Sequence, residues 1–184
     1  MEMRRVAIGL AGIILTAVAT AAHASYADDR AEIENLSARY FIAFDALDPK
    51  TYADTFTPDG VLIYGGGTAT GRQAIYDVIA KSKFGRAKKV PADTTSRPRA
   101  QHNIVNEVIE VSGNTATQKA YWFAMTNDTP DGTVKLLYMG HYQDELVKVK
   151  GRWLFKKRQI WNESLARVRS LFYPELGETD PREK

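Results

Sequence analysis

The chain has 184 residues, of which 44 % are apolar and 26 % charged, and its formal net charge is +3. This composition fits a globular domain with a sizeable core and excludes a largely disordered protein. So small a net charge does not indicate a nucleic-acid partner. Because the sequence contains no cysteine, disulfides, thiol catalysis and cysteine-based metal sites are excluded within it.

The first 24 residues have the pattern of a cleavable signal peptide. Two arginines precede an uncharged run, and Ala22-His23-Ala24 has the small-x-small pattern of a signal-peptidase site. The apolar part, Val6 to Ala19, is short for a membrane span, which needs about 20 residues. We therefore expect cleavage after Ala24, a periplasmic or secreted location, and no stable membrane anchor after processing.

The spacing of apolar residues predicts a long amphipathic helix over Asp29 to Asp48, with Asp28 or Asp29 as its N-cap. Its core-facing stripe consists of Ile33, Leu36, Tyr40, Phe44 and Leu47. Asp45 falls at the edge of this stripe rather than on the solvated side, so it can present a carboxylate to the core. A half-exposed aspartate near a helix end is the alternative interpretation.

The next elements are shorter. Pro49, with Asp48 as cap, opens a short second helix. A turn is predicted at residues 57–60, a strand over Val61 to Tyr64 that stops at three glycines, and a third helix from Arg72 to about Lys83. The basic stretch from Lys81 to Arg99 is predicted to be a solvated connection, with an anion-binding rim or lid as the alternative.

The C-terminal half consists of strands. Four strand-like segments, separated by strong turn signals, are Gln101 to Val111, Thr115 to Thr126, Thr133 to Val149 and Arg152 to Asn162. Short turns between long strands predict an antiparallel meander. Helices followed by this meander give an α+β domain over residues 25–164, with the sheet wrapped over the helices. Residues 165–184 are expected to form a partly ordered tail.

The candidate catalytic residues are few. His102 shares a predicted strand face with Ile104 and Val108, so we expect it in apolar surroundings, where a neutral imidazole can accept a proton. Asp45 is the natural candidate for a carboxylate that orients the ring. A structural histidine bonded to a backbone carbonyl is the alternative. Tyr40 and Tyr64 can each donate a phenolic hydrogen bond to a substrate oxygen, or can simply fill the core.

Other side chains are candidates for a pocket. The aromatic residues expected to line it are Trp122, Phe123, Tyr138 and Trp161. His141 shares a predicted face with Leu137, Met139 and Gln143, and is either a polar pocket residue or a structural histidine. No Walker loop, G-x-S-x-G or H-E-x-x-H motif occurs, and with so few histidines no metal site is expected. Proton transfer without a cofactor, in an apolar pocket, remains.

Several segments together resemble the SnoaL-like branch of the nuclear transport factor 2-like (NTF2-like) superfamily. They are R-Y-F-I-A-F-D-A-L-D (39–48), T-F-T-P-D-G-V (55–61), G-R-Q-A-I (71–75), R-A-Q-H-N-I-V-N (99–106) and G-R-W-L-F-K-K-R (151–158). The resemblance implies a cone-shaped, mixed but mostly antiparallel sheet, curved around N-terminal helices, with an apolar pocket open at one end. It also places Asp45 and His102 on the Asp–His dyad of the group that includes scytalone dehydratase, bile-acid dehydratase and lindane dehydrochlorinase. Tyr64 and Tyr40 match substrate-binding tyrosines of that group.

Two hypotheses about function follow. In the first, the protein is an exported acid/base enzyme of the dehydratase, elimination or isomerase type, acting without a cofactor on a small apolar ring compound. His102 would be the general base, Asp45 would orient it, and Tyr64 with Tyr40 would hold the substrate oxygen. In the second, the same pocket binds a hydrophobic small molecule without catalysis, or the open sheet face serves dimerisation. The resemblance also leads us to expect a homodimer.

Overall fold

The computed structural model describes residues 25–82 and 100–164. The helices are α1 (Tyr26–Asp45), α2 (Pro49–Asp54) and α3 (Arg72–Ala80), and the strands are β1 (Phe56–Tyr64), β2 (Gly67–Thr70), β3 (Ala100–Ser112), β4 (Thr115–Thr126), β5 (Lys135–Val149) and β6 (Arg152–Asn162). The expected signal peptide (1–24), most of the basic connection (83–99) and the expected tail (165–184) lie outside the described residues. Within the described ranges, no helix is long and apolar enough to cross a membrane.

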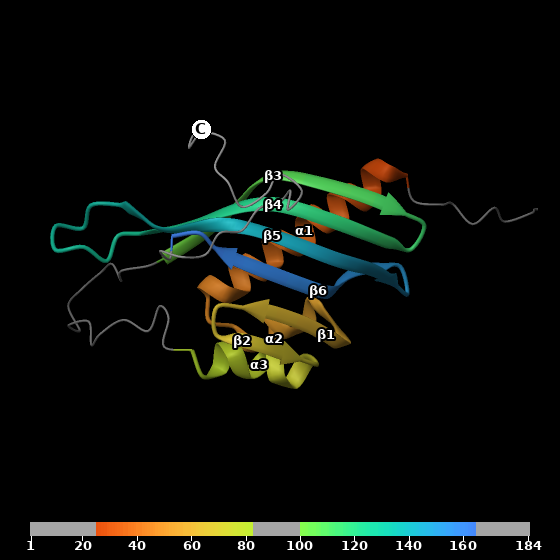
Figure 1. Ribbon diagram of the computed structural model, residues 1–184, viewed down its shortest axis with the longest axis horizontal. Coiled ribbons are helices and arrows are strands. Elements are labelled where there is room, and N and C mark those ends of the chain that lie inside the picture. The colour runs from red at the N-terminus through yellow and green to blue at the C-terminus, as the bar shows by residue number, and fades with distance from the viewer. Residues whose placement is uncertain (1–24, 83–99, 165–184) are drawn as a thin grey trace, which may run out of the picture.

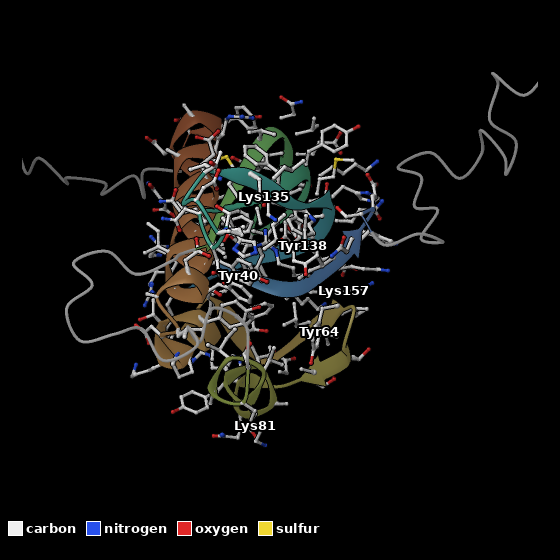
Figure 2. The ribbon with its side chains drawn as sticks, turned by 90° about the vertical axis from the view of Figure 1, so that its left-hand side faces the viewer. Tyr40, Tyr64, Lys81, Lys135, Tyr138 and Lys157 are labelled. Atoms are coloured by element: carbon white, nitrogen blue, oxygen red, sulfur yellow. The ribbon has the colours of Figure 1, made fainter. Side chains whose placement is uncertain are left out.

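The strands form a curved sheet in the order β2-β1-β6-β5-β4-β3. The C-terminal strands β3 to β6 are an antiparallel meander, as predicted, and only β1 and β6 pair in parallel among the described strands. The helix α1 crosses one face of the sheet, and α3 lies beside β1 and β2 (Figure 1). Tyr40 from α1 and Tyr138 from β5 lie in the interior between helix and sheet (Figure 2). The expectation of a curved, mixed, mostly antiparallel sheet around N-terminal helices is confirmed.

The first helix is displaced toward the N-terminus relative to its prediction. It begins at Tyr26 because Ser25 forms a capping box with Asp28. It ends at Asp45 rather than Asp48, since the chain turns into a left-handed conformation at Leu47 (φ 54°).

The predicted cap Asp29 instead has a tertiary role. Its carboxylate accepts hydrogen bonds from Lys148 Nζ (2.6 Å) and Trp153 Nε1 (2.8 Å). Burial alone would raise the pKa of Asp29, but these two hydrogen bonds outweigh it and leave the pKa below its ordinary value. This carboxylate therefore ties the start of α1 to the hairpin of β5 and β6.

The region around the first strand also differs from its prediction. Residues 57–60 are not a turn but part of β1, whose register with β6 shifts between Phe56 and Val61. Such a bulge bends the strand and changes its direction without ending it. The three glycines lead into a strand that the sequence analysis missed, β2, and α3 ends at Ala80 instead of continuing to Lys83. Two small residues and two threonines in β2 gave no apolar alternation to detect.

A second bulge decides which side chains of β3 face inward. The register with β4 shifts between Val105 and Val108, where Asn106 adopts φ 55°. His102 and Ile104 lie before the bulge and face the interior, whereas Val108 is 58 % exposed. The expectation that Val108 shares the face of His102 is therefore wrong, because one extra residue inverts the alternation of a strand.

An ion pair lies completely buried under the inner face of the sheet. Arg158 of β6 donates from Nε and Nη2 to the two carboxylate oxygens of Asp144 on β5, at 2.9 and 2.7 Å. Its guanidinium carbon lies 3.9 Å from the centroid of the Phe155 ring and 4.3 Å from that of the Tyr40 ring. Burial alone would lower the pKa of Arg158, but the Asp144 carboxylate outweighs it and the pKa rises above its ordinary value. Burial also raises the pKa of the Asp144 carboxyl above its ordinary value, and the Arg158 charge opposes this shift only in part.

We predict that Asp144→Asn lowers the free energy of unfolding by about 3–5 kcal/mol, because it leaves the buried Arg158 charge uncompensated. The neighbouring Glu145→Gln is the matched control, since Glu145 is exposed and its contact with Lys157 is 3.3 Å long. That variant should change stability by about 0.5 kcal/mol or less. Urea denaturation followed by circular dichroism measures both, and equal effects would contradict the assigned role of the buried pair.

Candidate active site

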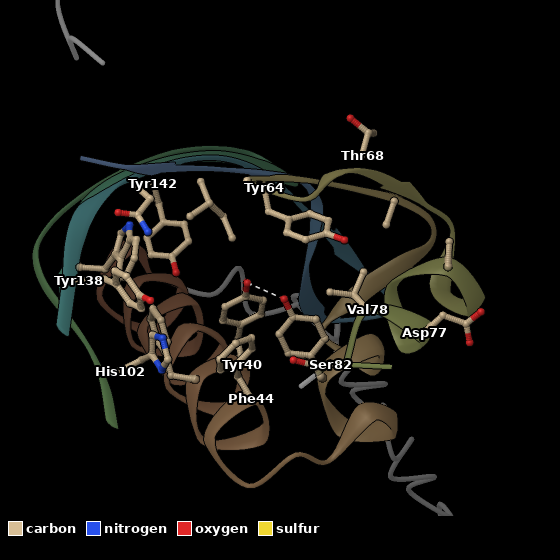
Figure 3. Close-up of a pocket in the computed structure, with 18 of the residues that line it drawn as sticks. Tyr40, Phe44, Tyr64, Thr68, Asp77, Val78, Ser82, His102, Tyr138 and Tyr142 are labelled. Atoms are coloured by element: carbon tan, nitrogen blue, oxygen red, sulfur yellow. Dashed lines mark hydrogen bonds between the residues drawn. The ribbon is translucent and has the colours of Figure 1, made fainter. Parts of the chain in front are cut away.

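A cavity of about 720 Å³ lies between the helices and the inner face of the sheet. Aromatic side chains dominate its wall (Figure 3). The aromatic and histidine residues that line it are Tyr40, Phe41, Phe44, Tyr52, Tyr64, His102, Trp122, Tyr138 and Tyr142. Its polar contributors include Thr68, Asp77, Ser82 and Asn162. A mostly apolar cavity with a few polar groups is typical of small-molecule sites.

Asp45 and His102 are in direct contact at the edge of this cavity. One carboxylate oxygen of Asp45 lies 2.6 Å from His102 Nδ1, and the other accepts a hydrogen bond from the His102 backbone N–H at 2.9 Å. The carboxylate therefore fixes both the ring and the main chain of the histidine. With Nδ1 facing Asp45, Nε2 is the ring nitrogen that can reach a ligand. The Asp45 side chain is 20 % exposed and the His102 side chain is 8 % exposed.

The His102 ring is surrounded by aromatic rings. Phe41 stacks with it at a centroid distance of 6.0 Å, and Phe44 meets it edge-on at 4.7 Å. Trp122 stacks with it at 6.0 Å. The imidazole is consequently held in one orientation by packing as well as by its hydrogen bond.

The position of Trp122 depends on a glycine in the neighbouring strand. Its indole N–H donates to the backbone oxygen of Trp161 at 3.1 Å. A Cβ at Gly140, the residue opposite Trp122, would lie 1.8 Å from that oxygen and 2.9 Å from the indole nitrogen. Only a residue without a side chain permits this arrangement, which gives Gly140 a specific role in shaping the wall beside His102.

The candidate tyrosines also reach the cavity. The Tyr40 hydroxyl accepts a hydrogen bond from the Tyr52 hydroxyl at 2.7 Å. Burial raises the pKa of Tyr40, and it raises the pKa of Tyr52 and Tyr142 well above the ordinary value. These buried phenols therefore stay protonated near neutral pH and can act as donors. Tyr64 lies across the cavity from His102 (Figure 3).

The pocket residues expected from the strands divide between the two faces of the sheet. Trp122 and Tyr138 line the cavity. Phe123, His141 and Trp161 do not line it, because their register partners alternate with the inward residues and place them on the opposite, convex face. The expectation that these three line the pocket is wrong for this cavity.

His141 forms a separate, buried arrangement on the convex face. Its Nδ1 lies 2.6 Å from Glu163 Oε1, and its ring stacks on Trp161 at 4.5 Å. Burial lowers the pKa of His141, and the Glu163 carboxylate opposes this shift only in part. The interpretation as a structural histidine fits these contacts.

Sequence reasoning did not name many of the residues that line the cavity, among them Tyr52, Tyr142 and Asn162. A signal existed for Tyr142, which follows Tyr138 at an even spacing on the same strand and so shares its face. Tyr52 lies on a helix of six residues, too short to show a periodic pattern. Asn162 is the last residue of β6, where alternation gives little support. In the part of the chain that the structure describes, no group of three or more His, Asp or Glu side chains could hold a metal ion.

Comparison with known proteins assigns the family. The sequence profile of the SnoaL-like domain matches residues 25–159. The chain belongs to the SnoaL-like family. No curated protein matches it.

Several solved structures share the fold of this SnoaL-like chain. An NTF2-like protein with a cystatin-like fold from Novosphingobium aromaticivorans is 24 % identical and has a TM-score of 0.64, over 79 % of this chain and 90 % of that one. A protein from Catenulispora acidiphila in complex with S-DNPA is 27 % identical (TM-score 0.61; 75 % and 96 % covered). A candidate scytalone dehydratase from Novosphingobium aromaticivorans is 26 % identical (TM-score 0.57; 73 % and 83 % covered).

We predict that Gly140→Ala displaces the Trp122 indole and lowers the free energy of unfolding by about 1–3 kcal/mol or more, as overpacking of a core does. Gly65→Ala is the control, because an added Cβ there meets no atom within 4 Å. Near-ultraviolet circular dichroism reports the Trp environment, and denaturant unfolding reports stability. An unchanged tryptophan signal in Gly140→Ala would refute the role of Gly140.

Proposed function

We propose that this SnoaL-like protein catalyses a cofactor-independent elimination, most simply a dehydration, on an apolar ring compound bound in the cavity. The observation that carries the proposal is the contact of Asp45 with both the ring and the main chain of His102 at the cavity wall. An imidazole whose Nδ1 is held by a carboxylate is oriented for proton abstraction through Nε2. A similar structure described as a candidate scytalone dehydratase supports the reaction class.

The proposed reaction divides between a base and a donor. His102 removes a proton from a carbon next to an electron-withdrawing group, and the electron pair of that C–H bond becomes the new double bond. The C–O bond of the leaving hydroxyl breaks, and the oxygen departs as water with a proton that balances the one taken up by His102. Asp45 stabilises the imidazolium that forms. Phenols such as Tyr40 and Tyr64 supply hydrogen bonds to substrate oxygens.

The aromatic wall has a chemical consequence for this step. An apolar cavity excludes water, so the charge that develops on the substrate interacts with fixed protein donors rather than with solvent. General acid–base catalysis contributes about 10²–10⁴ in rate. Packing of Phe41, Phe44 and Trp122 around His102 keeps the base in the geometry on which that factor depends.

We predict that the protein accelerates dehydration of a bicyclic β-hydroxy ketone, a β-hydroxytetralone, to naphthol and water, which naphthol fluorescence measures. His102→Ala should lower the rate by about 10²–10⁴-fold because the base is lost. Asp45→Asn should lower the rate by a smaller factor, because the amide oxygen can still accept a hydrogen bond from one of the two His102 N–H groups that contact Asp45. His141→Gln is the control, because that histidine also bonds a carboxylate but lies on the convex face.

Two results would contradict the assignment of His102 as the general base. One is a His102→Ala variant that keeps the wild-type rate while remaining folded by circular dichroism. The other is an equal loss of rate in His141→Gln, which would indicate a general effect on the fold.

We also propose that the convex face of the sheet binds a second copy of the chain. Large apolar side chains are exposed on that face, on β3, β4 and β5: Val105, Val108, Tyr121, Leu136 and Met139. Contiguous exposed apolar residues on one face indicate an interface, and a two-fold homodimer is the commonest closed assembly. Because the cavity opens on the other side of the sheet, dimerisation and ligand binding are compatible.

We predict that Met139→Lys converts the protein to a monomer, since a charge placed in an apolar interface loses its hydration. Sedimentation equilibrium measures the mass. Val149→Lys adds the same charge at an exposed apolar position at the end of β5, away from the proposed centre, and should leave the dimer intact. A wild-type protein that sediments as a monomer would refute the second proposal.

A further inference from the structure

Two buried phenols meet at the cavity wall and come from different helices. Tyr40 of α1 and Tyr52 of α2 have ring centroids 4.5 Å apart, and their hydroxyl oxygens are 2.7 Å apart. Both residues are 2 % exposed or less, and both line the cavity. The Tyr52 hydroxyl donates a hydrogen bond to the Tyr40 oxygen, which the dashed line in Figure 3 marks.

This donation leaves the proton of Tyr40 available for another acceptor. A phenol carries one proton, and burial raises the pKa of Tyr40 and Tyr52, so both remain protonated. Within the described ranges, Tyr40 makes no hydrogen bond as a donor. A buried hydroxyl whose proton has no partner is costly unless a ligand or water accepts it. The cavity is the direction from which such an acceptor can come.

The surroundings of Tyr40 favour a strong donor. The guanidinium carbon of Arg158 lies 4.3 Å from the centre of the Tyr40 ring, and a cation at that distance stabilises electron density that shifts onto the phenol oxygen. The hydrogen bond received from Tyr52 acts in the same sense, because a hydroxyl that accepts a hydrogen bond becomes a better donor.

We propose that Tyr52 is a positioning residue, which acts on a ligand only through Tyr40 by directing the Tyr40 proton toward a ligand oxygen. The inference rests on the proposed function in one respect, namely that the ligand is an apolar ring compound bearing an oxygen. It assigns a purpose to the Tyr52 hydroxyl, since phenylalanine at that position would fill the same volume without a buried polar group. His102 is proposed to accept a proton from the substrate, whereas the Tyr40–Tyr52 pair is proposed to donate a hydrogen bond to it.

A thermodynamic cycle with naphthol as probe tests this role. Binding is measured by naphthol fluorescence at neutral pH in wild type, Tyr40→Phe, Tyr52→Phe and the double variant. We expect Tyr40→Phe to weaken binding by about tenfold, the equivalent of one hydrogen bond. Tyr52→Phe should weaken it by about threefold, because the donor remains but is less polarised. The double variant should bind as weakly as Tyr40→Phe alone, since Tyr52 acts only through Tyr40.

The controls separate this role from a structural one. Tyr76→Phe makes the same change on the exposed face of α3 and should leave naphthol affinity unchanged. Multiplicative effects of the two substitutions in the double variant would overturn the proposal, as would wild-type protein that does not bind naphthol. The outcome is independent of turnover: a protein that binds naphthol with the expected coupling but does not dehydrate the β-hydroxytetralone retains the Tyr52 role and loses the catalytic proposal.

Discussion

Two carboxylates anchor the long helix α1 to the sheet, and the site depends on both attachments. Near its start, Asp29 accepts hydrogen bonds from Lys148 and Trp153 on β5 and β6. At its end, Asp45 accepts two from His102 on β3. The helix therefore spans the concave face between opposite ends of the meander. Because charge-assisted hydrogen bonds are directional, these attachments fix the distance between helix and sheet, and this distance sets the width of the cavity.

The helix also carries groups that serve the site and groups that serve the core, on adjacent turns. Tyr40 packs against the buried cation of Arg158 and against Tyr52, while Phe41 and Phe44 pack against His102. The core and the cavity wall thus share side chains in this protein. A substitution in the aromatic cluster therefore changes the packing of the core and the shape of the cavity together.

Much of the architecture could be predicted from the sequence because it follows from local patterns. The bounds of β4 and β6 coincide with the turn signals that flank them, and the meander follows from short connections. The cavity positions of Tyr40, Tyr64, Trp122 and Tyr138 follow from helical and strand periodicity. What could not be predicted depends on contacts distant in sequence. The buried contacts of Asp29 with Lys148 and Trp153 are decided by tertiary packing. The Asp45–His102 pair was a candidate from the sequence, but its geometry also depends on that packing. Two errors were local: the Ser25 capping box was overlooked, and strand alternation already places Phe123 opposite Trp122 and His141 opposite Tyr138.

The bulge at Asn106 divides β3 into two parts with different partners. His102 and Ile109 both face inward, although their positions in the sequence differ by an odd number and they would point to opposite faces in a regular strand. The part before the bulge contributes the histidine, and the part after it contributes to the core. In any alignment of this chain with a relative whose third strand is regular, a gap must therefore fall between these two positions. An alignment that matches the histidine and runs through without that gap would pair core residues with solvent-facing ones.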